Sequence, residues 1–154
     1  MCLNPVLDVS NSQAIEDYAK AIYALSAERE GLVLNGEVAE RLGVTPATAT
    51  AMLQKLATLG LVDYEPYKGV RLTAGGERVA LEVIRHHRLL EAYLAEALGM
   101  PEDRVHEEAE VLEHYISEEL EALMAAKLGE PSHDPHGSAI PGPDLLPPAA
   151  GGGR

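Results

Sequence analysis

Apolar positions recur every three or four residues through the first 60 residues of the chain, a spacing typical of amphipathic helices. This periodicity predicts helices over residues 12–29, 34–42 and 46–60. Thr45 is a favourable N-cap, and Pro46 suits the first position of the third helix. The apolar stripe comprises Ile15, Ala19, Ile22 and Leu25 in the first helix, and Ala49, Met52, Leu53 and Leu56 in the third.

Two short runs rich in β-forming residues follow the third helix and predict a hairpin. Residues 61–65 and 70–73 read as strands, and residues 66–69 read as the turn between them. Three helices followed by such a hairpin are typical of a winged helix-turn-helix. We therefore interpret residues 1–74 as a DNA-binding domain with a two-stranded wing.

Helical periodicity resumes after the hairpin and predicts a second, helical domain over residues 75–130. A long helix is expected over residues 73–98, followed by shorter helices over 102–115 and 117–128. Residues 131–154 are rich in Pro and Gly, which is typical of an irregular tail or linker. The predicted fold class is therefore mainly α.

Composition changes this picture in two ways. The chain has no Phe or Trp, so aliphatic residues and six Tyr must fill the core, and its formal net charge is −13. Residues 1–75 hold six basic and nine acidic residues, a net of −3, whereas residues 76–154 hold six and sixteen, a net of −10. The charge argues against a general nucleic-acid binder, and the acid excess in the second half favours cation binding there.

The sequence gives no sign of a membrane partner. No apolar run approaches the roughly 18–20 residues of a membrane span, and the N-terminus lacks a basic region followed by an apolar stretch. A cytoplasmic location is expected.

The third predicted helix has small and polar residues on the face opposite its apolar stripe, as a helix that enters the major groove requires. Thr methyl groups and Ala can pack on thymine methyls, Gln54 can read a base edge, and Lys55 can bind phosphate. The candidate DNA-binding residues are Thr45, Ala47, Thr48, Thr50, Ala51, Gln54 and Lys55 on the helix, and Lys68 and Arg71 on the wing.

Imidazoles and carboxylates in the second domain have metal-ligand spacing. His87 and Glu91 are one helical turn apart. At about 100° per residue, four side chains of the next helix fall within an arc of about 100°. These four are His106, Glu110, Glu113 and His114. Such nitrogen and oxygen donors favour a borderline-to-hard ion such as Mn²⁺ or Fe²⁺, although a solvated acidic face would show the same spacing.

Several motifs along the chain occur together in one known family. They are Glu16-Asp17-Tyr18 with Ala21-Ile22-Tyr23, the run Val38-Ala39-Glu40-Arg41-Leu42, the segments 45–62, 85–91 and 106–114, and the proline-rich segment 134–141. Together these motifs resemble the DtxR/MntR family of metal-dependent repressors, named for the diphtheria toxin repressor and the manganese transport regulator. The resemblance implies a winged helix-turn-helix followed by a helical dimerisation and metal-binding domain.

The resemblance also implies two regulatory metal sites per chain. The first set is Asp17, Glu110, Glu113 and His114; the second is His87, Glu91 and His106. Carboxylates at Asp17 and Glu110 match the manganese branch of the family, where the iron branch has Met and Cys, and therefore favour Mn²⁺ over Fe²⁺. Lys20 stands where the manganese branch has a glutamate ligand, and the second set matches the iron branch.

The function expected from this resemblance is a manganese-dependent, or alternatively iron-dependent, repressor of metal-uptake genes. Metal would order a homodimer that binds double-stranded DNA at a palindromic operator, with no small-molecule substrate. Asp17 lies on the first helix of the DNA-binding half, so metal ligation would link the two halves.

Two other function classes stay open from the residues alone. One is a metal-independent winged-helix regulator that senses an organic ligand or a protein partner. The other is a carboxylate-bridged di-metal enzyme, but such enzymes use a Glu-x-x-His pair on two helices, and this chain offers Asp103-x-x-His106 without a matching pair.

Overall fold

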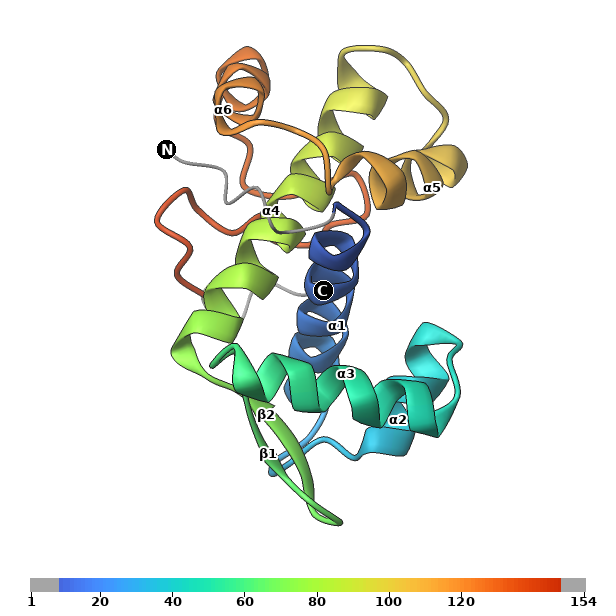
Figure 1. Cartoon of the computed structure of the whole chain (residues 1–154). Coiled ribbons are helices and arrows are strands. Elements are labelled where there is room, and N and C mark those ends of the chain that lie inside the picture. Colours follow the sequence, from blue (N-terminus) through green and yellow to red (C-terminus); the bar gives the residue numbers. More distant parts are fainter. Residues whose placement is uncertain (1–8, 148–154) are drawn as a thin grey trace. The chain divides into compact units, whose positions relative to one another are not determined.

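The computed structural model describes residues 9–147, and the chain forms two compact units, Met1–Ala80 and Leu81–Arg154. The elements are mainly helical, with one two-stranded antiparallel sheet, which confirms the predicted fold class (Figure 1). In chain order they are α1 (Val9–Ala27), α2 (Asn35–Leu42), α3 (Pro46–Thr58), β1 (Val62–Glu65), β2 (Gly69–Leu72), α4 (Ala74–Glu96), α5 (Glu102–Leu112) and α6 (Glu118–Lys127).

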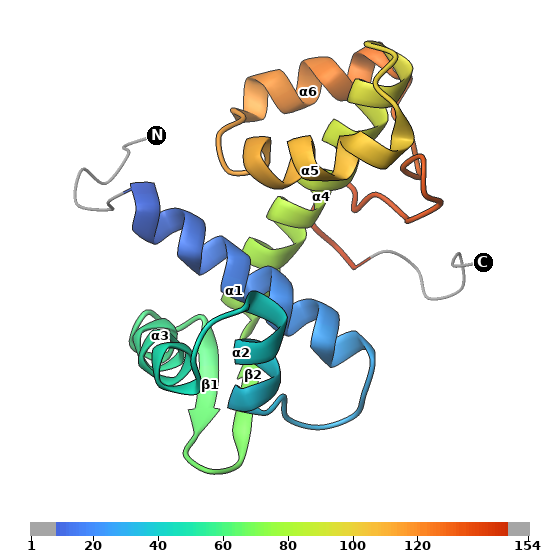
Figure 2. The ribbon, with the colours of Figure 1, turned by 90° about the vertical axis from the view of Figure 1, so that its right-hand side faces the viewer.

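The N-terminal unit is a winged helix-turn-helix. Helices α1, α2 and α3 share one aliphatic core with the β1–β2 hairpin, and Ile22, Leu53 and Val70 are among its fully buried members. Figure 2 shows the hairpin, which is the wing, extending from the three helices. Val62 pairs with Leu72 in the register of the hairpin. The helix-turn-helix and the wing are therefore held together by one core.

Local sequence signals fix the end of α2 and the start of α3. Thr45 Oγ1 accepts a hydrogen bond from the Thr48 N–H at 3.1 Å, and Pro46 occupies the first helical position. Gly43 ends α2 in the left-handed conformation, with φ +67°. These residues set the tight turn that aims α3 away from α2.

Gly69 allows the chain to pass close to the base of the wing. Val33 and Val70 exchange two backbone hydrogen bonds, 2.8 and 2.9 Å long. A Cβ atom at residue 69 would lie 2.5 Å from the carbonyl oxygen of Val33. Only glycine therefore fits where this strand meets the segment before α2.

The C-terminal unit packs α5 and α6 against the second part of α4. The buried residues of this core are Leu89, Leu90, Ala109, Met124 and Ala125. The segment after α6 is irregular and is fastened to α4 by two guanidinium groups. Arg85 donates to the carbonyl of Pro141 at 2.8 Å, and Arg88 donates to the carbonyl of Ala139.

The described part of the chain contains no helix that is both long and apolar enough to span a membrane.

Replacing Leu53 with Ala should destabilise the N-terminal unit by about 2–5 kcal/mol, because Leu53 is fully buried in the core. Chemical unfolding followed by circular dichroism measures this free energy. Leu59→Ala is the matched control, since Leu59 is 49% exposed, and it should change the unfolding free energy far less. Equal losses in the two variants would contradict the assignment of Leu53 to the core.

Candidate metal centre and DNA-reading face

His87 lies at the centre of a buried cluster of imidazoles and carboxylates in the C-terminal unit. Helix α4 places His87 and Glu91 one turn apart, and they are 5% and 2% exposed. His87 Nε2 lies 2.5 Å from Glu91 Oε1, and His87 Nδ1 lies 2.5 Å from Glu113 Oε2. His87 therefore contacts Glu91 of its own predicted ligand set and also Glu113 of the other set.

Helix α5 brings His106 and Glu110 to the exposed side of the same cluster. His106 Nδ1 lies 3.2 Å from His87 Nε2, and His106 Nε2 lies 3.2 Å from Glu110 Oε1. His87, His106 and Glu110 each offer one ligand atom within 4.8 Å of the other two. The side chains of His106 and Glu110 are about half exposed, so a solvated ion could reach these donors.

A second group of donors includes two residues from the tail. Glu91, Asp134 and His136 each offer a ligand atom within 4.8 Å of the others. Asp134 Oδ1 accepts hydrogen bonds from the backbone N–H groups of His136 and Ser138, which closes a tight turn and aims His136. His136 Nδ1 then lies 2.8 Å from Glu91 Oε2.

The candidate ligands expected from the sequence do not include Asp134 or His136, which lie in the segment interpreted as an irregular tail or linker. His133 does bond locally, with Nδ1 2.9 Å from Ser132 Oγ, but His136 reaches Glu91. The Asp-Pro-His-Gly sequence signals a turn with two metal-type donors, but not the segment of the chain it will face.

Glu113 and His114 lie at the end of α5 rather than inside it. The helix ends at Leu112, two or three residues before the expected end, and Glu113 is its C-cap. Glu113 is 1% exposed, and its Oε1 lies 3.4 Å from His114 Nε2. Asp17, the remaining candidate ligand, lies on α1 of the N-terminal unit and is partly buried.

The electrostatics of Glu91 fit a divalent cation. Burial would raise the pKa of Glu91, but the hydrogen bond from His87 and the charges of His87, His136 and His106 outweigh it, so the pKa is lowered. The carboxylate is therefore ionised and ready to ligate. Its Oε2 is buried and has no hydrogen-bond partner among the described residues, although His136 Nδ1 lies 2.8 Å away. Such an oxygen is costly unless a cation satisfies it.

A separate network of buried polar side chains, formed by Arg85, His86 and Glu121, adjoins this cluster. His86 Nε2 lies 2.7 Å from Glu121 Oε2, His86 Nδ1 lies 3.2 Å from the backbone oxygen of Glu113, and Arg85 pairs with Glu121 Oε1. Burial would lower the pKa of His86, but Glu121 outweighs it and raises the pKa. These contacts give His86 a structural role in the C-terminal unit.

The candidate DNA-reading residues lie on the open face of α3 and on the wing. All of them are exposed except Thr50, which is partly buried. Thr45 and Thr48 are joined by a 2.8 Å hydrogen bond between their hydroxyls, and this bond orders the start of the face. The face is formed by Thr45, Ala47, Thr48, Thr50, Ala51, Gln54 and Lys55, with Lys68 and Arg71 on the wing.

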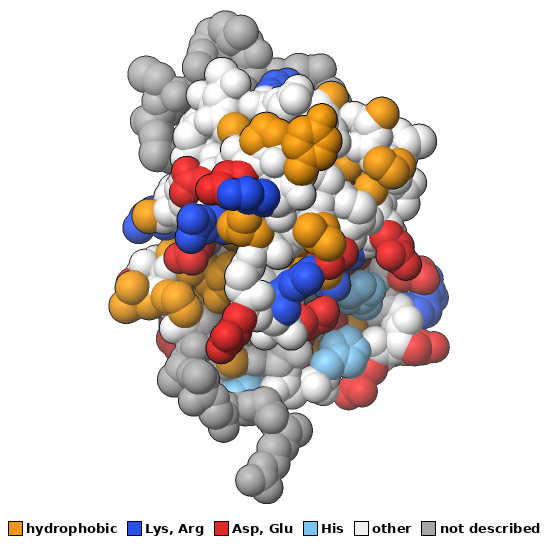
Figure 3. Space-filling view, turned by 90° about the horizontal axis from the view of Figure 1, so that it is seen from below, with side chains coloured by type: hydrophobic (Ala, Val, Ile, Leu, Met, Phe, Trp, Pro, Cys, Tyr) orange, Lys and Arg blue, Asp and Glu red, His pale blue; other side chains and the backbone are white. Residues whose placement is uncertain are grey.

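Acidic neighbours accompany the basic residues of the wing. Lys68 lies 4.0 Å from Glu65, and Arg71 lies 4.0 Å from Asp63. Figure 3 shows basic side chains next to acidic ones rather than a continuous basic field. Binding to DNA would therefore depend on shape and specific contacts more than on bulk charge.

Comparison with known proteins identifies the family. Residues 11–70 match the N-terminal DNA-binding domain of iron-dependent repressors, and residues 73–142 match their metal-binding and dimerisation domain. The chain belongs to the iron-dependent repressor family. It is a metal-dependent transcriptional regulator and not an enzyme, and the resemblance inferred from the motifs is confirmed.

Several proteins of this family are similar to most of the chain. A helix-turn-helix regulator of Methanocaldococcus jannaschii is 39% identical, over 71% of this chain and 87% of that protein. The regulator MntR of Escherichia coli O6:H1 is 38% identical, over 74% of this chain and 72% of that protein. The diphtheria toxin repressor of Corynebacterium efficiens is 35% identical, over 82% of this chain and 55% of that longer protein.

Solved structures of this family show the same fold. A manganese-dependent transcriptional repressor in complex with manganese has a TM-score of 0.80 and 46% identity, over 88% of this chain and 62% of that one. ScaR with bound Zn²⁺ has a TM-score of 0.73 and 35% identity, over 83% of this chain and 59% of that one. This repressor-family chain thus spans about three-fifths of each of those chains.

Replacing Glu121 with Ala should destabilise the C-terminal unit by about 3–5 kcal/mol, because it leaves Arg85 and His86 buried without their carboxylate. Thermal and urea unfolding of the metal-free protein measure the loss. Glu119→Ala, on the exposed side of the same helix, is the control and should be nearly neutral. Similar stability of both variants would rule out a structural role for Glu121.

Proposed function

We propose that this chain is a manganese-dependent repressor of metal-uptake genes that acts on operator DNA in the cytoplasm. The observation that carries the proposal is the cluster around the buried His87, which contacts buried Glu91 and Glu113 and the exposed His106 at 2.5 to 3.2 Å. It lies in the part of the chain that matches the metal-binding domain of the family.

The proposed ligands form two sets of donors. Glu110, Glu113 and His114 belong to the first, and Asp17 joins them because its motif matches the first helix of the family. His87, Glu91 and His106 form the second set, and we add Asp134 and His136 as further donors beside Glu91. Two divalent ions per chain would use these donors.

The donor chemistry favours Mn²⁺, with Fe²⁺ as the alternative. Every proposed ligand atom is a carboxylate oxygen or an imidazole nitrogen, and no thiolate takes part. Relatives include structures with bound manganese, Zn²⁺ and Cd²⁺, so the fold accommodates several divalent ions. The carboxylates at Asp17 and Glu110 give the preference for the harder ion.

Divalent cations would neutralise the negative charge of the proposed carboxylate ligands. Asp17, Glu91, Glu110 and Glu113 carry four negative charges, which would balance two such ions. His87 and His106 orient the carboxylates beside them. Ligands drawn from α1 and from the C-terminal unit would make metal binding and the conformation of the DNA-binding unit depend on each other.

We propose that a second copy of the chain covers the apolar surface of α5 and α6. Val111, Tyr115 and Leu123 are each more than half exposed there, and Leu120 is 44% exposed. The matched family domain is a dimerisation domain. A two-fold dimer would present two α3 helices to successive major grooves, about 34 Å apart, on a palindromic operator.

Titration of the metal-free protein with Mn²⁺, with the free ion followed by electron paramagnetic resonance, should give about two bound ions per chain. His114→Ala and His106→Ala should each lose a different ion, since these two residues belong to different groups of donors, whereas Glu110 lies in the same group as His106. Glu107→Ala is the matched control, because Glu107 is an exposed acid on the same helix. The absence of saturable binding would overturn the manganese assignment, and the titration would then be repeated with Fe²⁺.

Metal-dependent DNA binding should be lost in Glu113→Ala, because this buried carboxylate contacts both His87 and His114. The measurement is fluorescence anisotropy of a labelled duplex selected from random-sequence DNA by the Mn²⁺-loaded protein. Glu108→Ala, at an exposed position of α5, serves as the control and should bind normally. Unchanged metal-dependent binding by Glu113→Ala would contradict the switch.

A further inference from the structure

The tip of the wing is a tight turn with an unusual residue at its third position. The Lys68 N–H donates to the Glu65 carbonyl at 3.0 Å, which closes a four-residue turn. Pro66 holds the second position with its fixed negative φ, and Tyr67 holds the third with φ +67°. This combination defines a type II turn, in which the third position ordinarily holds Gly or Asn.

Packing of the Tyr67 side chain within its own unit does not stabilise this backbone conformation. A left-handed conformation costs a residue with a Cβ roughly 1–2 kcal/mol. The side chain is fully exposed, at 105% of the reference area, so no packing offsets that cost. A strained backbone that carries an exposed aromatic ring points to a role outside the folded chain.

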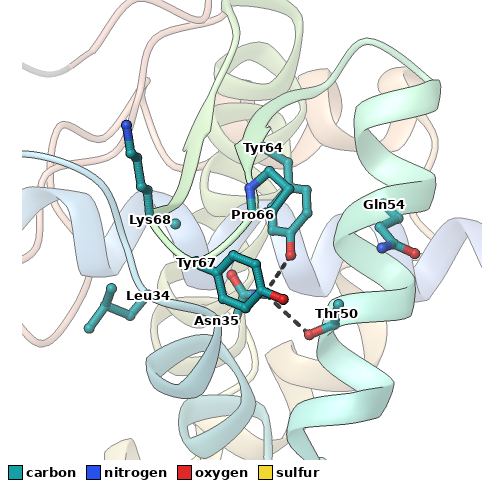
Figure 4. Close-up of a pocket in the computed structure, with 9 residues that line it drawn as sticks. Leu34, Asn35, Thr50, Gln54, Tyr64, Pro66, Tyr67 and Lys68 are labelled. Carbon is teal, nitrogen blue, oxygen red and sulfur yellow. Dashed lines mark hydrogen bonds between the residues drawn. The ribbon is translucent and has the colours of Figure 1, made fainter.

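Tyr67 stands at the edge of a groove between the wing and α3. The groove has a volume of about 470 Å³. Figure 4 shows Thr50 and Gln54 of α3 on one side and Pro66, Tyr67 and Lys68 of the wing on the other. The α3 side chains are among those expected to face DNA. The groove therefore extends from the candidate DNA-reading face of α3 to the tip of the wing.

The base of the groove is held in place by hydrogen bonds. Asn35, the first residue of α2, donates from Nδ2 to Thr50 Oγ1 and to the Tyr64 hydroxyl, both at 3.2 Å. These bonds tie α2, α3 and β1 together (Figure 4). The spacing between α3 and the wing is therefore set before any partner binds.

We propose that this groove seats one sugar–phosphate strand of operator DNA, and that Tyr67 is a DNA-contact residue at its edge. When α3 lies in the major groove, the strand that borders that groove passes between the helix and the wing. The Tyr67 hydroxyl donates to a phosphate oxygen while its ring packs on the sugar, and Lys68 supplies a positive charge.

The groove chemistry suits a nucleic-acid backbone. Its polar lining consists of hydroxyls, amides and one ammonium, which pair with phosphate and sugar oxygens. Lys68 is free to turn toward a phosphate, because its side chain is 75% exposed and Glu65 lies 4.0 Å away. Every lining residue falls within the segment that matches the DNA-binding domain of the family. The inference rests on the proposed function.

The test compares Tyr67→Gly and Tyr67→Phe with the unchanged full chain, loaded with Mn²⁺, by fluorescence anisotropy on the selected duplex. Tyr67→Gly should bind about fivefold more weakly, the loss expected for one interfacial hydrogen bond and its ring contact. Its thermal unfolding midpoint should stay equal or rise, since glycine relieves the strained turn. The DNA affinity of Tyr67→Phe should fall between those of Tyr67→Gly and the unchanged chain, and an affinity equal to that of the unchanged chain would contradict the hydroxyl–phosphate hydrogen bond.

Leu145→Gly is the control, because it removes another large residue at positive φ, far along the sequence from the wing. It should leave DNA affinity unchanged. Full affinity in Tyr67→Gly would overturn the inference, and so would a lowered unfolding midpoint, which would give Tyr67 a structural role. Failure of the unchanged chain to bind DNA with Mn²⁺ would instead overturn the proposed function.

Discussion

The burial of carboxylates among imidazoles is the constraint on which the C-terminal unit depends. Glu91 and Glu113 are nearly inaccessible to solvent, and both contact the ring of His87. Charges removed from water are tolerated only when a partner compensates them. Helices α4 and α5 must therefore hold the ligands at contact distance, and the aliphatic core of Leu89, Ala109 and Met124 fixes that approach. The same packing that stabilises the unit presents the donors to a cation.

The winged helix-turn-helix and the helical ligand pairs could be predicted because their signals are local. Helical periodicity, the Thr45 cap and the spacing of His87 and Glu91 act within one or two turns. The tail donors could not be predicted, since His136 reaches Glu91 only when the tail folds back along α4. Nor does the Pro-Tyr-Lys-Gly sequence reveal that Tyr67, rather than the glycine, takes the strained third position.

The acidity of the chain restricts how it can recognise DNA. The net charge is −13, and the wing places Glu65 near Lys68 and Asp63 near Arg71. Weak exposed pairs of this kind contribute little stability, but they reduce the field that would draw any duplex to the surface. Selectivity would then come from the small residues of α3 and from the fixed spacing of the wing. A regulator that must ignore most of a genome benefits from such a surface.

The anchoring of the tail by Arg85 and Arg88 also limits how far the tail donors can move from Glu91. Because the carbonyls of Ala139 and Pro141 are held against α4, Asp134 and His136 stay tethered beside this helix. The effective concentration of donors tethered in this way is on the order of millimolar. Even donors of low intrinsic affinity would therefore compete well with free ligands in solution.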